Sequence, residues 1–293
     1  MTQTFGGKWT DEKLEVMRRY FSAYAQALKY QPFSKWYIDA FAGTGDRATV
    51  KTPDRQEDTL FGDDKSDFVE VKEGSVRIAL GINPPFEKYV FVEQSAEYVV
   101  ALEALQAEFP TRQIDIRSGD ANQILKDLAR TTDWQNIRAA MFIDPYGMQV
   151  DWSTLQALAA TKAVDIALLF PTGPLNRMLT RDGNIPPEWQ MRIDNHLGPC
   201  NWRDAAYQEL QMSDLFSGQS SSMRKTINTD GLRRFVYERL KSIFPYVCET
   251  QLELKNSKGA VLYHLFIICA NPLNAAGNLA MRLARSAMKP PST

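Results

Sequence analysis

A pair of glycines one residue apart follows a short apolar run that ends in an acidic side chain. The run covers residues 35–39, and the turn after it contains Phe41, Gly43 and Gly45. Bulky apolar residues followed by closely spaced glycines predict a buried strand that enters a tight turn. Because glycine tolerates positive φ and has no Cβ, such a turn lets a nucleotide approach the backbone at the first strand of an α/β sheet. We therefore expect a cofactor to be bound by Asp39, Phe41, Gly43 and Gly45, with an ordinary loop as the alternative.

Two further acids stand where later strands are expected to end. Glu93 closes the apolar run 89–93, and a carboxylate there can accept a bidentate pair of hydrogen bonds from two ribose hydroxyls. Its distance from the glycine turn exceeds the roughly 20 residues of a compact unit, and an insertion at 49–73 accounts for the excess. Asp120 follows the alternating run 113–117 and can accept from an adenine amine or, alternatively, cap a helix.

A third acid is followed by a rigid turn. Asp144, Pro145, Tyr146 and Gly147 come directly after the expected fourth strand. Proline fixes φ, glycine permits a sharp exit, and an aromatic ring beside a carboxylate can form a platform over the reactive end of a cofactor. We expect Asp144, Pro145 and Tyr146 to be catalytic.

The elements that must position these residues alternate between strand and helix. Five apolar strands, the first four each followed by a helix, predict a doubly wound, Rossmann-like and mostly parallel α/β sheet. Apolar residues at spacings of three and four predict an accessory N-terminal helix over 10–29, whose aromatics could line a substrate wall. Two more strands and a last helix are expected between 246 and 288.

Two segments interrupt this alternation within what we expect to be a single domain, 1–293. The segment 49–73 is charged and aperiodic, which predicts a lid or a solvated loop near the cofactor. The segment 172–229 predicts a helical insertion after the fifth strand, either a structural cap or a surface for an anionic substrate, because basic and aromatic residues alternate in it. Asn176 and Arg177 are its candidate substrate contacts.

Composition excludes several classes of function. A net charge of -1 predicts no whole-chain attraction to nucleic acid, so a polyanion would need a local basic patch. Three cysteines far apart and two histidines, His196 and His264, predict neither a disulfide framework nor a metal site. Ala48 replaces the third glycine of a dinucleotide fingerprint, which disfavours nicotinamide. With no long apolar run and no signal core at the N-terminus, we expect a cytoplasmic protein without a membrane partner.

The motifs resemble those of class I methyltransferases that use S-adenosylmethionine (SAM), and more narrowly the three-Cys-motif partner (TcmP) family. Asp39, Gly43 and Gly45 are similar to motif I, Glu93 to the acid after strand two, and residues 144–147 to motif IV. The narrower resemblance rests on residues 37–43, 73–75, 142–147 and 170–177 and covers nearly the whole chain. It implies a methyltransferase-like fold, SAM as the cofactor and a three-cysteine-motif, radical-SAM-like protein as a partner.

The departures from related families restrict the chemistry. Amino-directed nucleic-acid methyltransferases carry two prolines before the aromatic residue, whereas this chain has only Pro145, so methylation of a base amine is expected but not secured. Cytosine-C5 enzymes need a nucleophilic cysteine after proline beyond strand four, and Pro199-Cys200 stands in the wrong place. A methyltransferase, a SAM- or nucleotide-binding partner protein without transfer activity, and another α/β enzyme all remain open.

Overall fold

The computed structural model describes residues 8–44, 74–214 and 218–289, and its largest sheet has the strand order β3-β2-β1-β4-β5-β10-β8, with β9 paired to β10. Gly45 and the expected insertion 49–73 lie outside the described residues. The strands are β1 (Ser34–Asp39), β2 (Lys88–Glu93), β3 (Ile114–Ser118), β4 (Ile137–Ile143), β5 (Val164–Phe170), β8 (Tyr246–Val247), β9 (Leu252–Lys255) and β10 (Val261–Cys269).

The first five strands are parallel, and β10 runs antiparallel to β5. Strand β5 is buried along its whole length, as its continuous apolar sequence predicts for the interior of a parallel sheet. The chain builds β1, β2 and β3 outward and then returns to place β4 beside β1. The carboxyl ends of β1 and β4 therefore flank the switch point where ligands bind in open α/β sheets.

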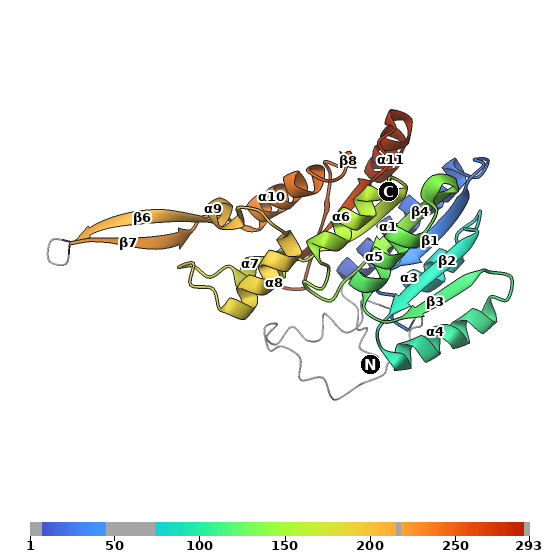
Figure 1. Ribbon diagram of the computed structural model, residues 1–293, viewed down its shortest axis with the longest axis horizontal. Helices are drawn as coiled ribbons and strands as arrows, with labels where there is room; N and C mark the ends of the chain where they lie inside the picture. Colours follow the sequence, from blue (N-terminus) through green and yellow to red (C-terminus); the bar gives the residue numbers. More distant parts are fainter. Residues whose placement is uncertain (1–7, 45–73, 215–217, 290–293) are drawn as a thin grey trace.

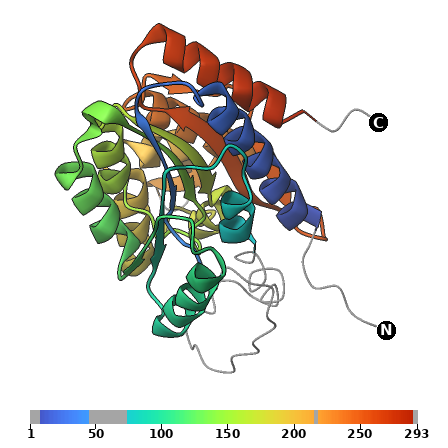
Figure 2. The same cartoon turned by 90° about the vertical axis from the view of Figure 1, so that its right-hand side faces the viewer.

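Helices cover both faces of this sheet (Figure 2). One face carries α1 (Lys8–Ala27), α3 (Ser75–Leu80), α4 (Ala96–Glu108) and α11 (Asn274–Ala287). The other carries α5 (Ala121–Thr131), α6 (Trp152–Ala160), α8 (Pro187–Leu197) and α10 (Thr229–Lys241), and a short 3-10 turn, η2 (Trp134–Asn136), leads into β4. Side chains alternate along β1, so that Tyr37 packs in the first layer and Ile38 in the second.

Helix α1 differs from its prediction mainly in what it buries. The expected stripe is present, with Leu14, Met17, Phe21 and Tyr24 all buried. Lys13 is buried on the same side and is completely inaccessible to solvent. Since an unpaired lysine is almost never placed in a core, this position requires an acidic partner.

The insertion after β5 is not wholly helical, which corrects the expectation for 172–229. It contains α7 (Thr172–Met178), α8, α9 (Trp202–Ala206) and a two-stranded ribbon of β6 (Tyr207–Asp214) and β7 (Gly218–Lys225). Figure 1 shows this ribbon projecting away from the large sheet. Its sequence lacks a clear apolar alternation of the kind that marks a strand with one buried face, so the pattern did not predict these two strands.

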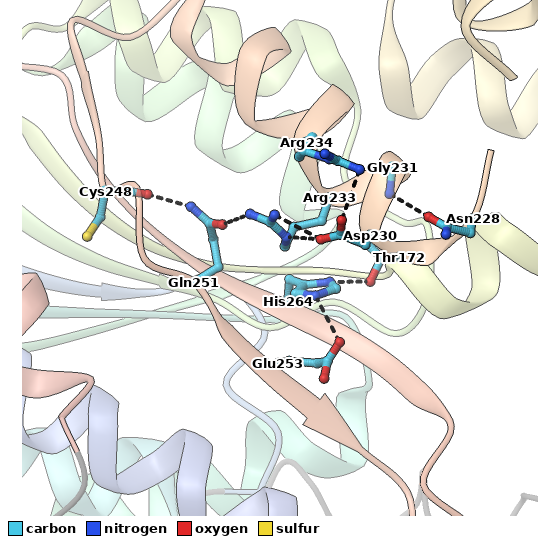
Figure 3. A network of polar contacts seen from close by, with 10 residues as sticks. All are labelled: Thr172, Asn228, Asp230, Gly231, Arg233, Arg234, Cys248, Gln251, Glu253 and His264. Carbon is cyan, nitrogen blue, oxygen red and sulfur yellow. Dashed lines mark hydrogen bonds and ion pairs between the residues drawn. The ribbon is translucent and has the colours of Figure 1, made fainter.

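A hydrogen bond connects the start of α7 to β10. Figure 3 shows the Thr172 hydroxyl at the ring of His264, with Oγ1 2.7 Å from Nδ1. The carboxylate of Glu253 lies 3.6 Å from the other ring nitrogen.

Across the described ranges, no helix is both long and apolar enough to cross a membrane.

Candidate functional site

Three of the expected acids meet at one edge of the sheet. Asp39 ends β1, Glu93 ends the neighbouring strand β2, and Asp144 follows β4 on the other side of β1. All three side chains are buried or nearly so. Parallel strands present their carboxyl ends at the same edge, so these distant residues converge at the switch point as their positions in the sequence predict.

Asp39 orients the loop that follows it. Its Oδ1 accepts from the backbone nitrogen of Phe41 at 3.2 Å, and its Oδ2 accepts from the hydroxyl of Ser75 at 2.7 Å. Ser75 is the first residue of α3, whose N-cap is Gly74 at φ 111°. This hydrogen bond connects the end of β1 to the start of α3, which lie on either side of residues 45–73 in the chain. Asp39 therefore holds both the turn after β1 and the start of α3.

Gly43 and Glu93 are joined directly. Gly43 has φ 65°, in the left-handed region that favours glycine, and its backbone nitrogen donates to Oε2 of Glu93 at 2.9 Å. Oε1 of Glu93 accepts from the backbone nitrogens of Gln94 and Ser95 at 2.9 and 2.8 Å. A carboxylate offers about four acceptor positions. Contacts from the described residues use three of them, and the contact of Glu93 with the ribose stays a prediction.

Asp120 caps a helix, which is the alternative role that the sequence left open for this residue. It is exposed at the start of α5, and its Oδ1 caps the helix by accepting from the backbone nitrogen of Gln123 at 2.9 Å. Gly119 precedes it at φ 147°, and the pair follows β3 at the outer side of the sheet. Its contact with an adenine therefore stays a prediction.

Asp144 has a partner that the sequence did not indicate. Nζ of Lys13 lies 2.7 Å from Oδ2 of Asp144, and both side chains are buried. The same ammonium lies 5.3 Å from the ring centre of Trp9. Burial lowers the pKa of Lys13, while the charges of Asp144 and then Asp39 act in the opposite direction. Lys13 thus places positive charge between the two acids at the switch point.

The turn after Asp144 presents an aromatic ring to solvent. Pro145 is buried, whereas 39% of Tyr146 is exposed and its backbone nitrogen donates to the side chain of Gln149 at 3.0 Å. Gly147 has φ 61°, and its nitrogen donates to the hydroxyl of Tyr263 on β10 at 3.4 Å. The side chain of Tyr146 is therefore partly exposed, and its stacking on a base stays a prediction.

Tyr263 closes the other side of this turn. It stacks on Trp9 with ring centres 6.1 Å apart and an interplanar angle of 17°. Burial, followed by the charge of Asp144, raises the pKa of Tyr263, and the charge of Arg177 opposes that increase. Helix α1 and strand β10 thus form one wall beside Asp144.

Of the two expected substrate contacts, Arg177 is the one whose charge acts on this wall. It is exposed on α7, whereas Oδ1 of Asn176 is buried and finds no hydrogen-bond partner among the described residues. Nζ of Lys225 at the base of the ribbon donates to the backbone oxygens of Asn176 and Leu179 at 2.5 and 3.0 Å. The ribbon and α7 are therefore linked.

His196 and Cys200 do not converge on a shared ligand. Nδ1 of His196 lies 2.7 Å from the backbone oxygen of Val150, and the thiol of Cys200 donates to the backbone oxygen of Leu197. Within the described ranges, no group of three or more histidine, cysteine or acidic side chains is arranged to hold a metal ion.

Comparison with known proteins relates the chain to others by its fold. No family model matches it, and no curated protein is significantly similar in sequence. A Legionella pneumophila protein of the DUF519 family has a similar crystal structure, with a TM-score of 0.51 and 12% sequence identity over 96% of this chain and 92% of that chain. An O-methyltransferase from Bacillus cereus in complex with SAH (S-adenosylhomocysteine) gives a TM-score of 0.38, 14% identity and coverages of 89% and 90%. The N-terminal domain of EvdMO1 with SAH bound gives 0.37, 12%, 86% and 80%.

The fold is shared. Together with the strand order, the first of these similarities confirms the Rossmann-like, mostly parallel α/β sheet predicted from the sequence. At 12% identity it gives no information about substrate or chemistry.

Sequence interpretation missed four residues that form the site, namely Trp9, Lys13, Ser75 as a donor, and Tyr263. Lys13 had a detectable signal, because it lies four residues before Met17 within the apolar stripe of α1. A lysine inside such a stripe indicates a buried carboxylate partner.

Proposed function

We propose that this protein is a SAM-dependent methyltransferase. The observation that carries the proposal is the hydrogen bond from the backbone nitrogen of Gly43 to Glu93 at the switch point. Asp39 holds the same turn, and Asp144 follows the neighbouring strand β4. A glycine at positive φ whose nitrogen donates to a carboxylate fits a nucleoside that approaches the backbone closely and donates a ribose hydroxyl. When bound, SAM supplies an electrophilic methyl group on a sulfonium.

The residues of the chain would divide the work of binding. Glu93 would accept from the ribose, the backbone from Phe41 to Gly43 would approach the nucleoside closely, and Asp120 would meet the adenine amine. Gly45, outside the described residues, stays in the proposal through its resemblance to motif I. The cationic end of SAM would meet Asp39 at the end of β1.

We propose an amine of a nucleic-acid base as the methyl acceptor. Asp144 and the Pro145 carbonyl would accept hydrogen bonds from the amine and align its lone pair. The half-exposed ring of Tyr146 would stack on the base, and Arg177 would meet a phosphate. The resemblance to the TcmP family supports a three-cysteine-motif protein as a partner.

A second candidate, a SAM-binding partner protein without transfer activity, is favoured by one contact. Lys13 donates to Oδ2 of Asp144, which reduces the acceptor positions left for a substrate amine. The two candidates differ in turnover but not in binding of SAM.

Calorimetry with SAM and SAH, followed by transfer of a tritiated methyl group to total RNA, DNA and protein, tests both candidates. We expect the wild type to bind both compounds and Gly43→Val to bind neither, because a β-branched residue is strained at φ 65° and fills the space that the ligand requires. Asp144→Ala should bind SAM but lose at least about a hundredfold in transfer. Unchanged affinity in a folded Gly43→Val protein would exclude this SAM site, and binding without label in any pool would favour the second candidate.

A further inference from the structure

Lys13 makes a contact that neither the predicted cofactor site nor the predicted substrate site requires. It comes from α1, 131 residues before Asp144 in the chain, and its ammonium reaches Oδ2 at 2.7 Å. The lysine is fully buried and 7% of the Asp144 side chain is exposed. A buried lysine is costly unless paired, so α1 carries it at the expense of stability that an apolar residue would supply.

The surroundings of Asp144 explain why a cation is placed there. The charge of Asp144 acts on Tyr37 of β1 and on Tyr263 of β10, and the charges of Asp144 and Asp39 both act on Lys13 of α1. Arg177 acts on Tyr263 from α7. Lys13 is therefore the cation paired with this buried carboxylate, at 2.7 Å from Oδ2.

We infer that Lys13 is the positioning residue for Asp144, keeping the carboxylate ionised while leaving Oδ1 to accept from the substrate amine. This inference rests on the proposed methyltransferase function. An ionised carboxylate is an acceptor at both oxygens, whereas a protonated one donates through one of them and would compete with an amine. Lys13 thereby makes α1 a part of the acceptor site.

Lys13→Met tests the inference because methionine keeps an unbranched apolar chain but removes the charge. An unpaired carboxylate in a buried site takes up a proton more readily than an exposed one. In this variant the folded state should bind more protons than the unfolded state across neutral pH, so that stability falls as pH rises. The midpoint of denaturant unfolding, measured from pH 5 to pH 9, reports this change without any assay of activity.

Two additional variants identify the responsible group. Lys13→Met combined with Asp144→Asn should abolish the new pH dependence, because no carboxylate remains to titrate. Lys13→Arg keeps a positive charge and should retain the pH dependence of the wild type. Lys35→Met is the matched control, since Lys35 is also buried and pairs with Glu87 at 2.6 Å at the opposite end of β1. It should lower stability without the new dependence on pH.

With a methyl acceptor available, the pH profile of kcat/KM gives a second measurement. Lys13→Met should lose at least about tenfold at pH 7 and recover part of this loss at higher pH, where Asp144 ionises. Lys13→Arg should restore most of the activity, and Lys35→Met should keep the wild-type profile.

The outcomes separate the inference from the function on which it rests. If Lys13→Met unfolds with the same pH dependence as Lys35→Met, Lys13 does not control Asp144 and the inference is overturned. If the unfolding series shows the coupling but the wild type labels no pool, the pairing stands and the methyltransferase function is rejected. If label appears and Lys13→Met keeps the wild-type profile, the function stands and the positioning role is overturned.

Discussion

At the scale of single residues, the acids that end the strands hold the backbone before they hold any ligand. Glu93 accepts three backbone hydrogen bonds and Asp39 accepts from Phe41 and Ser75. A carboxylate fixed in this way is preorganised, because the cost of ordering it falls on folding rather than on binding. We therefore expect these acidic side chains both to stabilise the local backbone and to contact a ligand.

Glu93→Gln tests this double role. The amide keeps the shape but presents NH2 at one position where a backbone nitrogen or a ribose hydroxyl donates. We expect SAM to bind about 10- to 150-fold more weakly, since hydrogen bonds to a charged group contribute roughly 1.5–3 kcal/mol. Calorimetry measures the change. Glu97→Gln, exposed in the first turn of α4, is the control and should bind as the wild type does.

Tyr146→Ala tests the predicted stacking position. With 39% of its surface exposed, the side chain contributes less to the core than a buried ring, so the unfolding midpoint should change little. Substrate binding should weaken by about 1–3 kcal/mol if a base stacks on the ring. Tyr30→Ala, which is 87% exposed, serves as the control. Equal KM values for Tyr146→Ala and the wild type would contradict the assignment.

The acids could be predicted from the sequence and their partners could not. Strand ends are marked by local patterns of apolar residues and glycine, and the parallel sheet then brings Asp39, Glu93 and Asp144 to one edge. Lys13 and Tyr263 lie more than a hundred residues from Asp144 in the sequence. They reach the same edge only because α1 and β10 pack beside it. No local pattern fixes such contacts.

At the scale of elements, the ribbon of β6 and β7 is the part that contributes least to the folded body. It pairs with itself, and among the described elements α9 is the one that it contacts most extensively. An isolated two-stranded ribbon is marginally stable in water, so these strands are held mainly at their base, where Lys225 binds the carbonyls of α7.

Shortening the ribbon should separate stability from substrate use. Gln208 and Arg224 are opposite one another in the register, so joining them by Asn-Gly makes a two-residue hairpin turn. We expect the unfolding free energy to change by less than about 0.5 kcal/mol, and SAM affinity to be unchanged. Transfer to long RNA or DNA should fall more than transfer to a short fragment, as measured with tritiated SAM. An equal loss for both acceptors would mean that the ribbon supports the active site instead.

At the scale of the whole molecule, two buried histidines and one buried aspartate change the stability of the fold in opposite directions as pH changes. Burial lowers the pKa of His196 and of His264 to about 4. Burial raises the pKa of Asp165 to about 6, although the Tyr20 hydroxyl donates to it at 3.1 Å. The histidines are kept neutral in the core, where a proton added to Nε2 of His196 would find no acceptor among the described residues and the ring packs on Phe170.

The sign of each contribution follows from which state binds more protons. Between about pH 4 and 6.5 the unfolded histidines are protonated and the folded ones are not, so stability is lost as pH falls. Between 3.8 and about 6 the folded Asp165 holds a proton that the unfolded chain releases, so its contribution to stability increases as pH falls. With two histidines against one aspartate, the histidine effect should predominate.

We therefore expect the wild type to unfold more easily at pH 5 than at pH 7, with His196 alone responsible for a loss of about 2 kcal/mol, at 1.36 kcal/mol for each pH unit below 6.5. His264 should act in the same direction, because burial lowers its pKa as well. His196→Asn keeps a donor for the Val150 carbonyl and removes the titrating ring, so its denaturation midpoint should vary less between pH 5 and 7. Asp165→Asn is the opposing control, because it removes the contribution that increases on acidification and should make the loss at pH 5 steeper. A His196→Asn protein with the pH dependence of the wild type would show that this ring does not titrate on unfolding.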